Sequence, residues 1–318
     1  MSIRHVALLV VSMSLPFAAT AQYPTKPIRL IVPQQAGSSN DTLSRVLANF
    51  MGDALGQQMV VDNRAGVGGI IGMEIGAAAA PDGHTLIAMA TAQVIAPHVQ
   101  RKLAYDTFKD FAPISLFGVT YNVFIAHPAL AAGNPKEFVA LAKARAGQIN
   151  MASAGPGSQS HLAGVMFAQL AGIDVLHVPY KGAGASVSAV LGNEAQFSVT
   201  PLPATVGHIK SGRLKALALS ARKRAPDLPE IPTFVEQGFN FESSGWNGLI
   251  APRAVPAHVL SQLHTTLVKV TALPAFREQM TRQGAEVVVN TPRDFAQFIR
   301  KEFDLFGPAV KAANLKAG

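Results

Sequence analysis

The residues best suited to chemistry lie in two turns rich in Gly, Ser and Ala, each of which opens a predicted helix. The first is MASAGPGSQSHLAGVMFAQLAG (151–172) and the second is HVPYKGAGASVSAVLG (177–192). Glycine lets the backbone approach a ligand closely, and a helix start exposes N–H groups with a partial positive charge. Such an end binds a carboxylate or a phosphate without Lys or Arg. The two turns therefore predict a site for a small anion.

Alternating strand and helix patterns must position these turns. Short apolar runs predict strands, and apolar residues at i, i+3 and i+4 predict helices, the first of them over 43–55. This alternation is typical of mostly parallel sheets with helices on both faces, which bind ligands beyond the carboxyl ends of their strands. Small-residue loops follow there, after Val32, Met89, Ala152 and Val178. The predicted strands are 28–32, 59–61, 85–89, 123–126, 149–152, 175–178, 195–199, 216–220 and 286–289, and later helices begin at 256, 274 and 291.

Residues 1–21 have the pattern of a secretory signal peptide. Arg4 precedes an apolar run over 6–17, and Ala19-Thr20-Ala21 forms an A-x-A cleavage site. The run is shorter than the roughly 20 residues that a transmembrane helix needs. Without Cys, the chain has no lipid-anchoring cysteine and no disulfide. We expect export to the periplasm and a mature protein that is not embedded in the membrane.

The composition is that of an ordinary globular protein, with 49% hydrophobic and 14% charged residues. Without the signal peptide, which holds one Arg, the formal charge is 26 − 19 = +7. The charges are dispersed and the densest basic cluster, 222–224, lies in a predicted loop, so we expect no nucleic-acid partner. A positive field favours anionic solutes. The length suggests roughly two domains.

Enzyme signatures are missing from the sequence. It contains no G-x-S-x-G elbow and no H-E-x-x-H motif, and its His residues are scattered singly. The glycines of 66–72 fail the G-x-G-x-x-G pattern because Ile71 stands at the last position, and they predict tight packing instead. Trp246 is likewise expected to pack in the core or at a hinge. We expect no cofactor, no metal and no catalysis, with a secreted hydrolase as the least favoured alternative.

Eight segments, in this order, resemble the periplasmic solute-binding proteins of tripartite tricarboxylate transporters, the TctC-like or Bug family. They are 23–33, 60–72, 80–86, 105–115, 153–164, 177–185, 245–252 and 283–288. The resemblance implies an α/β, two-lobed flytrap of the type II periplasmic-binding-protein kind, each lobe a mostly parallel sheet flanked by helices. We place the two crossings between lobes near 122–126 and 244–250. Lobe 1 is then 22–123 and 247–318, and lobe 2 is 124–246.

The resemblance implies capture of a small carboxylate or related metabolite by loop N–H groups, Ser/Thr hydroxyls and ordered waters. The partner it implies is a membrane permease of the tripartite tricarboxylate type. The sequence leaves open a second role, as a ligand sensor that docks on a membrane histidine kinase. The ligand-binding candidates are Gln34, Gln35, Gly37, Ser38, Asp41, Ala90 and Thr91 in lobe 1, and Ser153, Ala154, Gly157, Ser158, His161, Tyr180, Lys181, Gly182, Ala183 and Thr200 in lobe 2.

Several candidates have a purely structural alternative. Asp41 also fits as a helix cap, His161 as a capping or packing residue, and Lys181 as a cation in solvent. Gln34 and Gln35 stand at positions that are usually apolar in the family, which brings amide groups near the ligand. Thr200 stands where the family often has an acid, and the loss of that carboxylate favours anions over amines.

Overall fold

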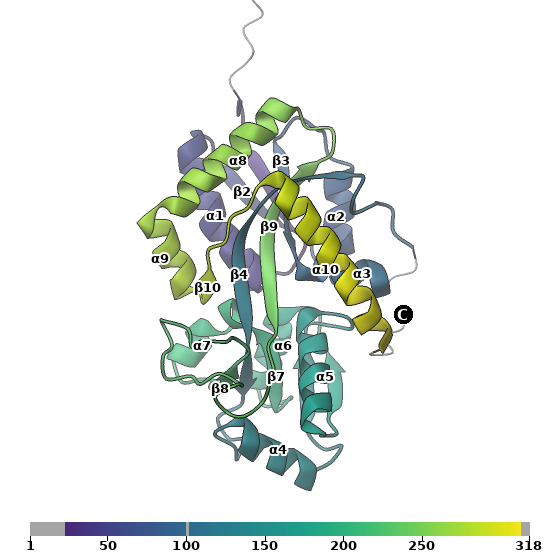
Figure 1. The fold of residues 1–318 in the computed structure, drawn as a ribbon, viewed down its shortest axis with the longest axis vertical. Helices are drawn as coiled ribbons and strands as arrows, with labels where there is room; N and C mark the ends of the chain where they lie inside the picture. The colour runs from purple at the N-terminus through teal and green to yellow at the C-terminus, as the bar shows by residue number, and fades with distance from the viewer. Residues whose placement is uncertain (1–22, 100–101, 313–318) are drawn as a thin grey trace, which may run out of the picture.

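The computed structural model describes residues 23–99 and 102–312, which form two lobes joined by long strands (Figure 1). The expected signal peptide, 1–21, lies outside the described residues. Within the described ranges, no helix combines the length and the apolar character needed to cross a membrane.

The first lobe is a mixed sheet with the strand order β2-β1-β3-β9-β4. Strands β2, β1 and β3 are parallel, whereas β9 and β10 pair antiparallel with β4. The strands are β1 (Ile28–Val32), β2 (Met59–Asn63), β3 (Thr85–Ala90), β4 (Phe111–Ala126), β9 (Ser244–Pro252) and β10 (Ala285–Glu286). The helices are α1 (Ser39–Leu55), the 3-10 turn η1 (Val67–Gly69), α2 (Ile70–Ala77), α3 (Thr91–Val99), α8 (Ala257–Ala272), α9 (Pro274–Arg282) and α10 (Pro292–Ala312).

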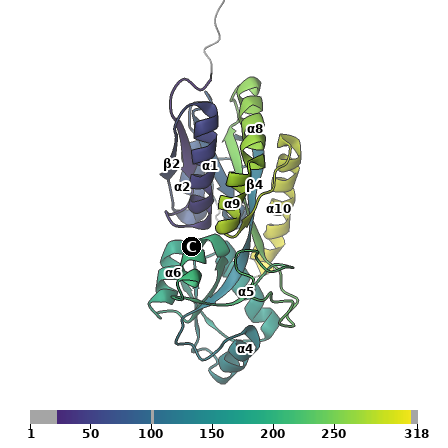
Figure 2. The same ribbon diagram turned by 90° about the vertical axis from the view of Figure 1, so that its left-hand side faces the viewer.

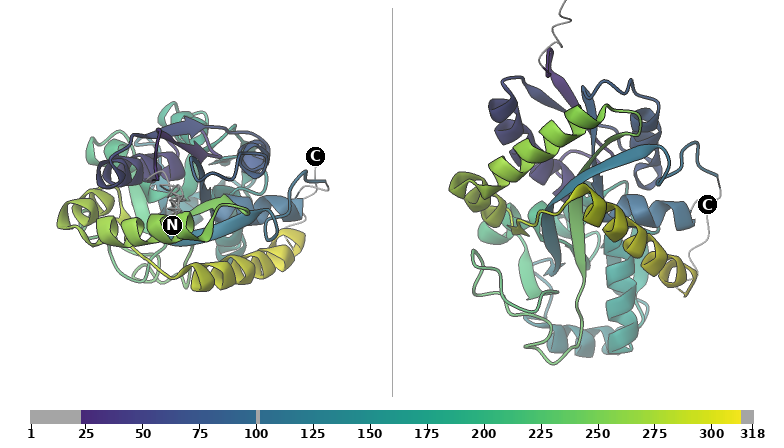
Figure 3. Two further views of the ribbon diagram at one scale, coloured as in Figure 1. Left: turned by 90° about the horizontal axis from the view of Figure 1, so that it is seen from above. Right: turned by 45° about the horizontal axis from the view of Figure 1, so that its top comes forward.

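Side-chain alternation along β1 explains the layers of this lobe. Ile28, Leu30 and Val32 pack with α1, α8 and α9, whereas Ile31 packs on the opposite face with α2, α3 and α10. The two helix groups lie on opposite sides of the sheet in Figure 1 and, seen from above, in Figure 3. Each fully buried aliphatic side chain contributes about 1.5–3 kcal/mol, so this double cover stabilises the first lobe.

The second lobe repeats the plan on a smaller scale. Strand β5 pairs parallel with β6 and β7, and the end of β4 pairs antiparallel with β7 and β8. Its core is a group of aromatic rings around Phe124, whose ring centroid lies 4.7 Å from that of Phe138. The elements are α4 (Pro135–Ala144), β5 (Asn150–Ser153), α5 (Gln159–Ala171), β6 (Leu176–Pro179), α6 (Ala183–Leu191), β7 (Phe197–Pro201), η2 (Leu202–Ala204), α7 (Val206–Lys210) and β8 (Lys215–Leu219).

Strand β4 belongs to both lobes, as Figure 2 shows. It pairs with β9 as far as Tyr121, opposite Ser244, and with β7 from Asn122 onward, opposite Pro201. The two-lobed α/β fold expected from the sequence is confirmed, but the sheets are mixed rather than mostly parallel. The reason is that β4 leaves the first lobe and β9 returns to it, so the two strands run in opposite directions and pair with each other.

Candidate functional site

A cleft of about 720 Å³ lies between the lobes and is lined by both. Its lobe 1 wall consists of the start of α1, the loop around η1, the end of β3 and one side of α3. Its lobe 2 wall consists of the loop 154–160 and the turn 180–183, the two segments that open α5 and α6. The small-residue loops predicted from the sequence therefore meet in one cleft.

Among the described residues, the lining of this cleft contains no acidic side chain and one basic side chain, the exposed Lys181. Most of its other polar groups are amides and hydroxyls, among them those of Gln34, Gln35, Gln159 and Asn247. The first turns of α1, α5 and α6 also reach the lining. Since N–H groups in a first turn have no partner within their own helix, the cleft favours an anion.

Hydroxyl groups hold the lobe 2 loop in shape. Ser158 is the N-cap of α5, and its Oγ accepts a hydrogen bond from the His161 N–H at 3.2 Å. Ser160 Oγ accepts from the Ala154 N–H at 2.9 Å, which folds the loop back over the end of β5. Gly157, with φ 72°, occupies the left-handed region that favours glycine.

Two histidines, His161 and His177, contact this lobe 2 loop and stabilise it. His161 Nδ1 accepts from the Gly157 N–H at 3.1 Å, and the His161 ring stacks on His177 with centroids 3.7 Å apart. His177 Nε2 lies 2.6 Å from Ser153 Oγ. Burial, and then the charge of His177, lower the pKa of His161 to about 4, and burial also lowers the pKa of His177. Both rings are therefore neutral at pH 7, which leaves His161 Nδ1 free to accept.

The second turn crosses close to lobe 1. Gly182 is the N-cap of α6 and has φ 119°, a conformation that side chains rarely adopt. A Cβ at Gly182 would lie 2.7 Å from Gln35 Oε1, so a side chain here would also displace the end of Gln35. A Cβ at Gly157 would lie 2.6 Å from Val99 of α3. The lobes thus touch on both sides of the cleft, which is the closed arrangement.

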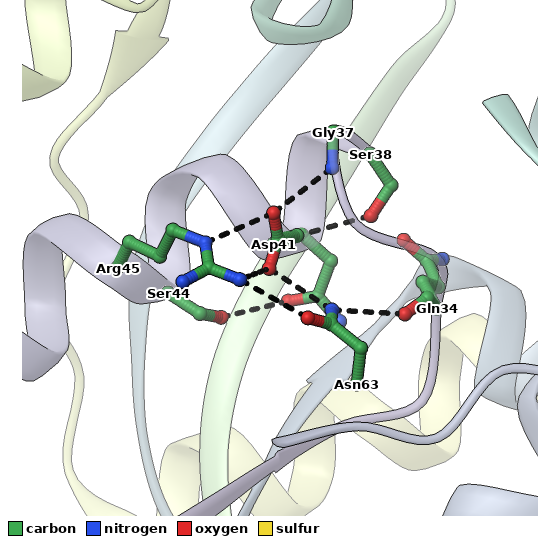
Figure 4. Close-up of polar contacts among 8 residues, drawn as sticks. Gln34, Gly37, Ser38, Asp41, Ser44, Arg45 and Asn63 are labelled. Carbon is green, nitrogen blue, oxygen red and sulfur yellow. Dashed lines mark hydrogen bonds and ion pairs between the residues drawn. The ribbon is translucent and has the colours of Figure 1, made fainter. Parts of the chain in front are cut away.

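The lobe 1 loop is held by the carboxylate of Asp41 (Figure 4). Asp41 is 3% exposed, and its Oδ2 accepts from the Gly37 N–H at 2.9 Å and from Arg45 Nε at 3.1 Å. Its Oδ1 accepts from Asn63 Nδ2 at 2.9 Å. The N-cap of α1 is Ser38, not Asp41. The Asp41 carboxylate is therefore neutralised within its own lobe and does not line the cleft.

The structure places the sequence candidates in two groups. Six are not part of the lining: the exposed Gly37, and the buried Asp41, Thr91, Ser153, His161 and Thr200. Thr91 Oγ1 accepts from the Trp246 N–H at 3.0 Å, and Thr200 is fully buried with no hydrogen-bond partner for its Oγ1 among the described residues. Eleven line the cleft directly: Gln34, Gln35, Ser38, Ala90, Ala154, Gly157, Ser158, Tyr180, Lys181, Gly182 and Ala183.

Sequence reasoning missed part of the lining. Gly66, Gly68 and Gly69 line the cleft, although the sequence predicts only packing for them. Packing is also present, since a Cβ at Gly69 would lie 2.8 Å from the Pro33 carbonyl oxygen. Their loop follows β2 at its carboxyl end, which is the signal that identified the other loops.

Trp246 lines the cleft and packs at the same time. Its ring lies 5.4 Å from Phe298, and its Nε1 donates to Glu302 Oε2 at 3.0 Å. Burial raises the pKa of Glu302, while the bond from Trp246 acts in the opposite direction. Because the indole N–H is occupied, Trp246 offers the cleft an aromatic surface rather than a donor. Thr120 and Asn247 are further lining residues that the sequence did not indicate, whereas Gln159 and Ser160 lie in the predicted turn 151–172 without being named as candidates.

Two lobes that meet around a cleft, joined by strands that cross between them, define a solute-binding protein of the flytrap class. Residues 43–315 match the family described as the tripartite tricarboxylate transporter family receptor, TctC, and the chain belongs to that family. It is a solute-binding receptor and not an enzyme, as the resemblance implied.

Individual relatives agree with this assignment. Protein BugT of Bordetella pertussis is 33% identical over 297 residues, which cover 92% of this chain and 91% of BugT. The solved structure of R. palustris Rpa4515 with adipate is 26% identical, with a TM-score of 0.89 and coverage of 93% of this chain and 100% of that chain. MatC from Rhodopseudomonas palustris with bound malate is 28% identical, with a TM-score of 0.83 and coverage of 91% and 100%.

Proposed function

We propose that this protein captures a small carboxylate in the cleft between its lobes and delivers it to a permease of the tripartite tricarboxylate type. The observation that carries the proposal is the lining itself, which joins the first turns of α1, α5 and α6 and has no acidic side chain within the described ranges 23–99 and 102–312. Its relatives solved with adipate and with malate support the same class of ligand.

Main-chain groups hold the carboxylate in this proposal. The loop that ends at Ser158 and the turn at Gly182 each open a helix on the lobe 2 wall, and their N–H groups suit one carboxylate. Ser158 Oγ accepts from its own helix, so its proton remains for the ligand or for Ser160 Oγ, 3.2 Å away. Gln34 and Gln35 contribute amides from the facing wall.

The other candidates have supporting roles in the proposal. The eleven lining residues contact the ligand, and the other six fix the shape of the loops. Asp41, for example, orients the loop before α1 through the Gly37 N–H. We further propose the lobe limits given above, 22–123 with 247–318 and 124–246, which the change of partner along β4 supports.

The proposal places the mature protein in the periplasm. Receptors of this family are periplasmic, and 1–21 has the pattern of a signal peptide cleaved before Gln22. N-terminal sequencing of the exported protein tests this step and should begin at Gln22. Recovery of an intact N-terminus in the membrane fraction would contradict it.

Native mass spectrometry of the freshly purified protein, followed by calorimetry, tests the ligand class. We expect a retained small anion, and we expect adipate or malate to bind where the uncharged diamide of adipic acid does not. Binding of the diamide as tightly as adipate would overturn the anion site. Turnover of a retained ligand, instead of a stable stoichiometric complex, would contradict a receptor.

A further inference from the structure

One buried asparagine holds the two chain crossings together. Asn122 is fully buried at the point where β4 passes from the first sheet to the second. Its N–H donates to Ser220 Oγ at 2.8 Å, and its carbonyl accepts from the Ser220 N–H at 2.8 Å. Its Nδ2 donates to Ser243 Oγ at 2.7 Å, directly before β9. Asn122 thus ties the outgoing crossing to the returning one.

Gln159 joins this junction from the cleft. It is the first residue of α5, and it lines the cleft. Its Nε2 donates to Asn122 Oδ1 at 3.1 Å. Its amide also lies against Gly245 of β9, where an added Cβ would come within 2.4 Å of Gln159 Oε1 and 2.6 Å of Nε2. Gln159 therefore contacts both crossing strands and the cleft.

The contact between Gln159 and Gly245 joins lobe 2 to the returning crossing strand. Helix α5 packs on β5 and β7 in lobe 2, whereas Gly245 of β9 pairs with Thr120 of lobe 1. A rotation of one lobe about the crossings moves α5 relative to β9 and so separates the amide from this glycine. Gly245 is not among the described glycines with positive φ, so an added Cβ would meet the adjacent amide and not a strained backbone.

We propose that Gln159 is a positioning residue of the hinge, whose amide holds the lobes in the closed arrangement through Asn122 and Gly245. Because Gln159 also lines the cleft, a ligand at the start of α5 fixes this amide and so favours closure. Only this last step rests on the proposed function. The contact of the amide with the crossing strands does not depend on which ligand binds.

The variant Gly245→Ala tests the contact without changing a residue of the lining. Its Cβ displaces the flexible end of Gln159, whereas the backbone at this position accepts alanine. The chain has no Cys, so spin labels on Asp53→Cys in α1 and Lys143→Cys in α4 report the distance between lobes. In ligand-free Gly245→Ala we expect a smaller closed population than in the wild type. With adipate as the probe, we expect binding about threefold to tenfold weaker.

A double variant separates the hinge from a direct ligand contact. In a Gln159→Ala background the amide is gone, so adding Gly245→Ala should change neither the distances nor the affinity further. A full additional effect would show that Gly245 acts on something other than Gln159, and it would overturn the proposal.

Asn122→Ala and Ser243→Ala form a matched pair. Both remove the bond between Asn122 Nδ2 and Ser243 Oγ, but only Asn122→Ala removes the acceptor of Gln159. We expect Asn122→Ala to open the lobes as Gly245→Ala does and Ser243→Ala to resemble the wild type. If Asn122→Ala does not fold, Gly245→Ala alone decides the matter.

The outcomes distinguish the hinge from the ligand class. If ligand-free Gly245→Ala has the same distribution of distances between the spin labels as the wild type, the proposed role of Gln159 is wrong. This conclusion does not depend on which ligand the protein binds. Failure of every carboxylate to bind the wild-type protein overturns the proposed function, while the ligand-free distances still decide the hinge contact.

Discussion

The two loops that face each other across the cleft are fixed by opposite means. In lobe 1, the carboxylate of Asp41 draws together Gly37, Arg45 and Asn63. In lobe 2, neutral hydroxyl and imidazole groups hold the loop that ends at Ser158. The difference teaches that the carboxylate of this site lies behind the wall and is already neutralised. Apart from the exposed Lys181, the described lining offers an anion uncharged donors.

The largest effect is expected from breaking the charged loop. Asp41→Ala leaves Arg45, Asn63 and the Gly37 N–H without their common acceptor. Because hydrogen bonds to a charged group contribute about 1.5–3 kcal/mol, we expect the free energy of unfolding to fall by about 2–3 kcal/mol, together with binding of the native ligand. Urea denaturation measures the free energy of unfolding, and calorimetry measures the binding. Asp53→Ala, an exposed position on the same helix, is the control and should change neither.

The next effect concerns the neutral side, at Gly182. With φ 119° and ψ 171°, this residue has a backbone conformation that is essentially restricted to glycine. Gly182→Ala should lower the free energy of unfolding by about 1–3 kcal/mol and weaken binding, since the new Cβ also meets Gln35. Gly184→Ala is the matched control, because its Cβ would lie at an ordinary 3.5 Å from the Ala36 carbonyl oxygen. Equal losses in the two variants would contradict this reading of the turn.

The lobe 2 loop should also respond to pH through His161. The pKa of His161 is lowered from 6.5 to about 4, so the folded protein prefers the neutral ring. The stabilisation is complete above pH 6.5 and is lost as the pH falls toward 4, because the unfolded chain takes up the proton first. Protonation of Nδ1 also removes the acceptor of the Gly157 N–H.

Thermal unfolding of wild type and His161→Asn across this range isolates the histidine. The wild-type melting temperature should fall more steeply with acid than that of His161→Asn, which retains an acceptor but does not titrate. Parallel curves for wild type and His161→Asn would show that the lobe 2 loop does not depend on a neutral imidazole.

The local sequence pattern was sufficient to predict some of the strands but not others. Strand β1 was predicted with its observed limits because Ile28, Leu30, Ile31 and Val32 are apolar and only Arg29 interrupts them. Most of β4 was missed, since Pro113, Ser115 and Gly118 interrupt the run. Their partners come from distant parts of the chain, as Ser115 Oγ shows by donating to the Asn290 carbonyl at 2.8 Å. Strand β10 is shorter than the expected strand 286–289, because only residues 285–286 pair with β4.

The site divides in a similar way. Loops that follow strands were found from their small residues, and eleven of the candidates line the cleft. The lining residues Trp246 and Asn247 lie on a crossing strand, where only the pairing of β9 with β3 and β4 brings them to the cleft. The sequence also does not show whether a polar residue lines the cleft or lies behind the lining. Asp41 and Ser38 lie close together in the sequence, yet Asp41 bonds within its own lobe, whereas Ser38 lines the cleft.

The smallest effect is expected at Lys181, the one basic side chain of the described lining. It is exposed at the edge of the lining, where water screens a charge pair, and such a pair contributes about 0–1 kcal/mol. Lys181→Met should therefore weaken binding of the native ligand by no more than about fivefold. Ser158→Ala, which removes an N-cap and a hydroxyl of the lining, should cost more, about 1 kcal/mol in stability and a further loss in affinity. Calorimetric titration of both variants at low and high salt shows which variant loses more affinity. If Lys181→Met abolishes binding while Ser158→Ala binds normally, the anion is held by a simple salt bridge to Lys181. In that case the view that uncharged groups of the lobe 2 lining bind the anion is wrong.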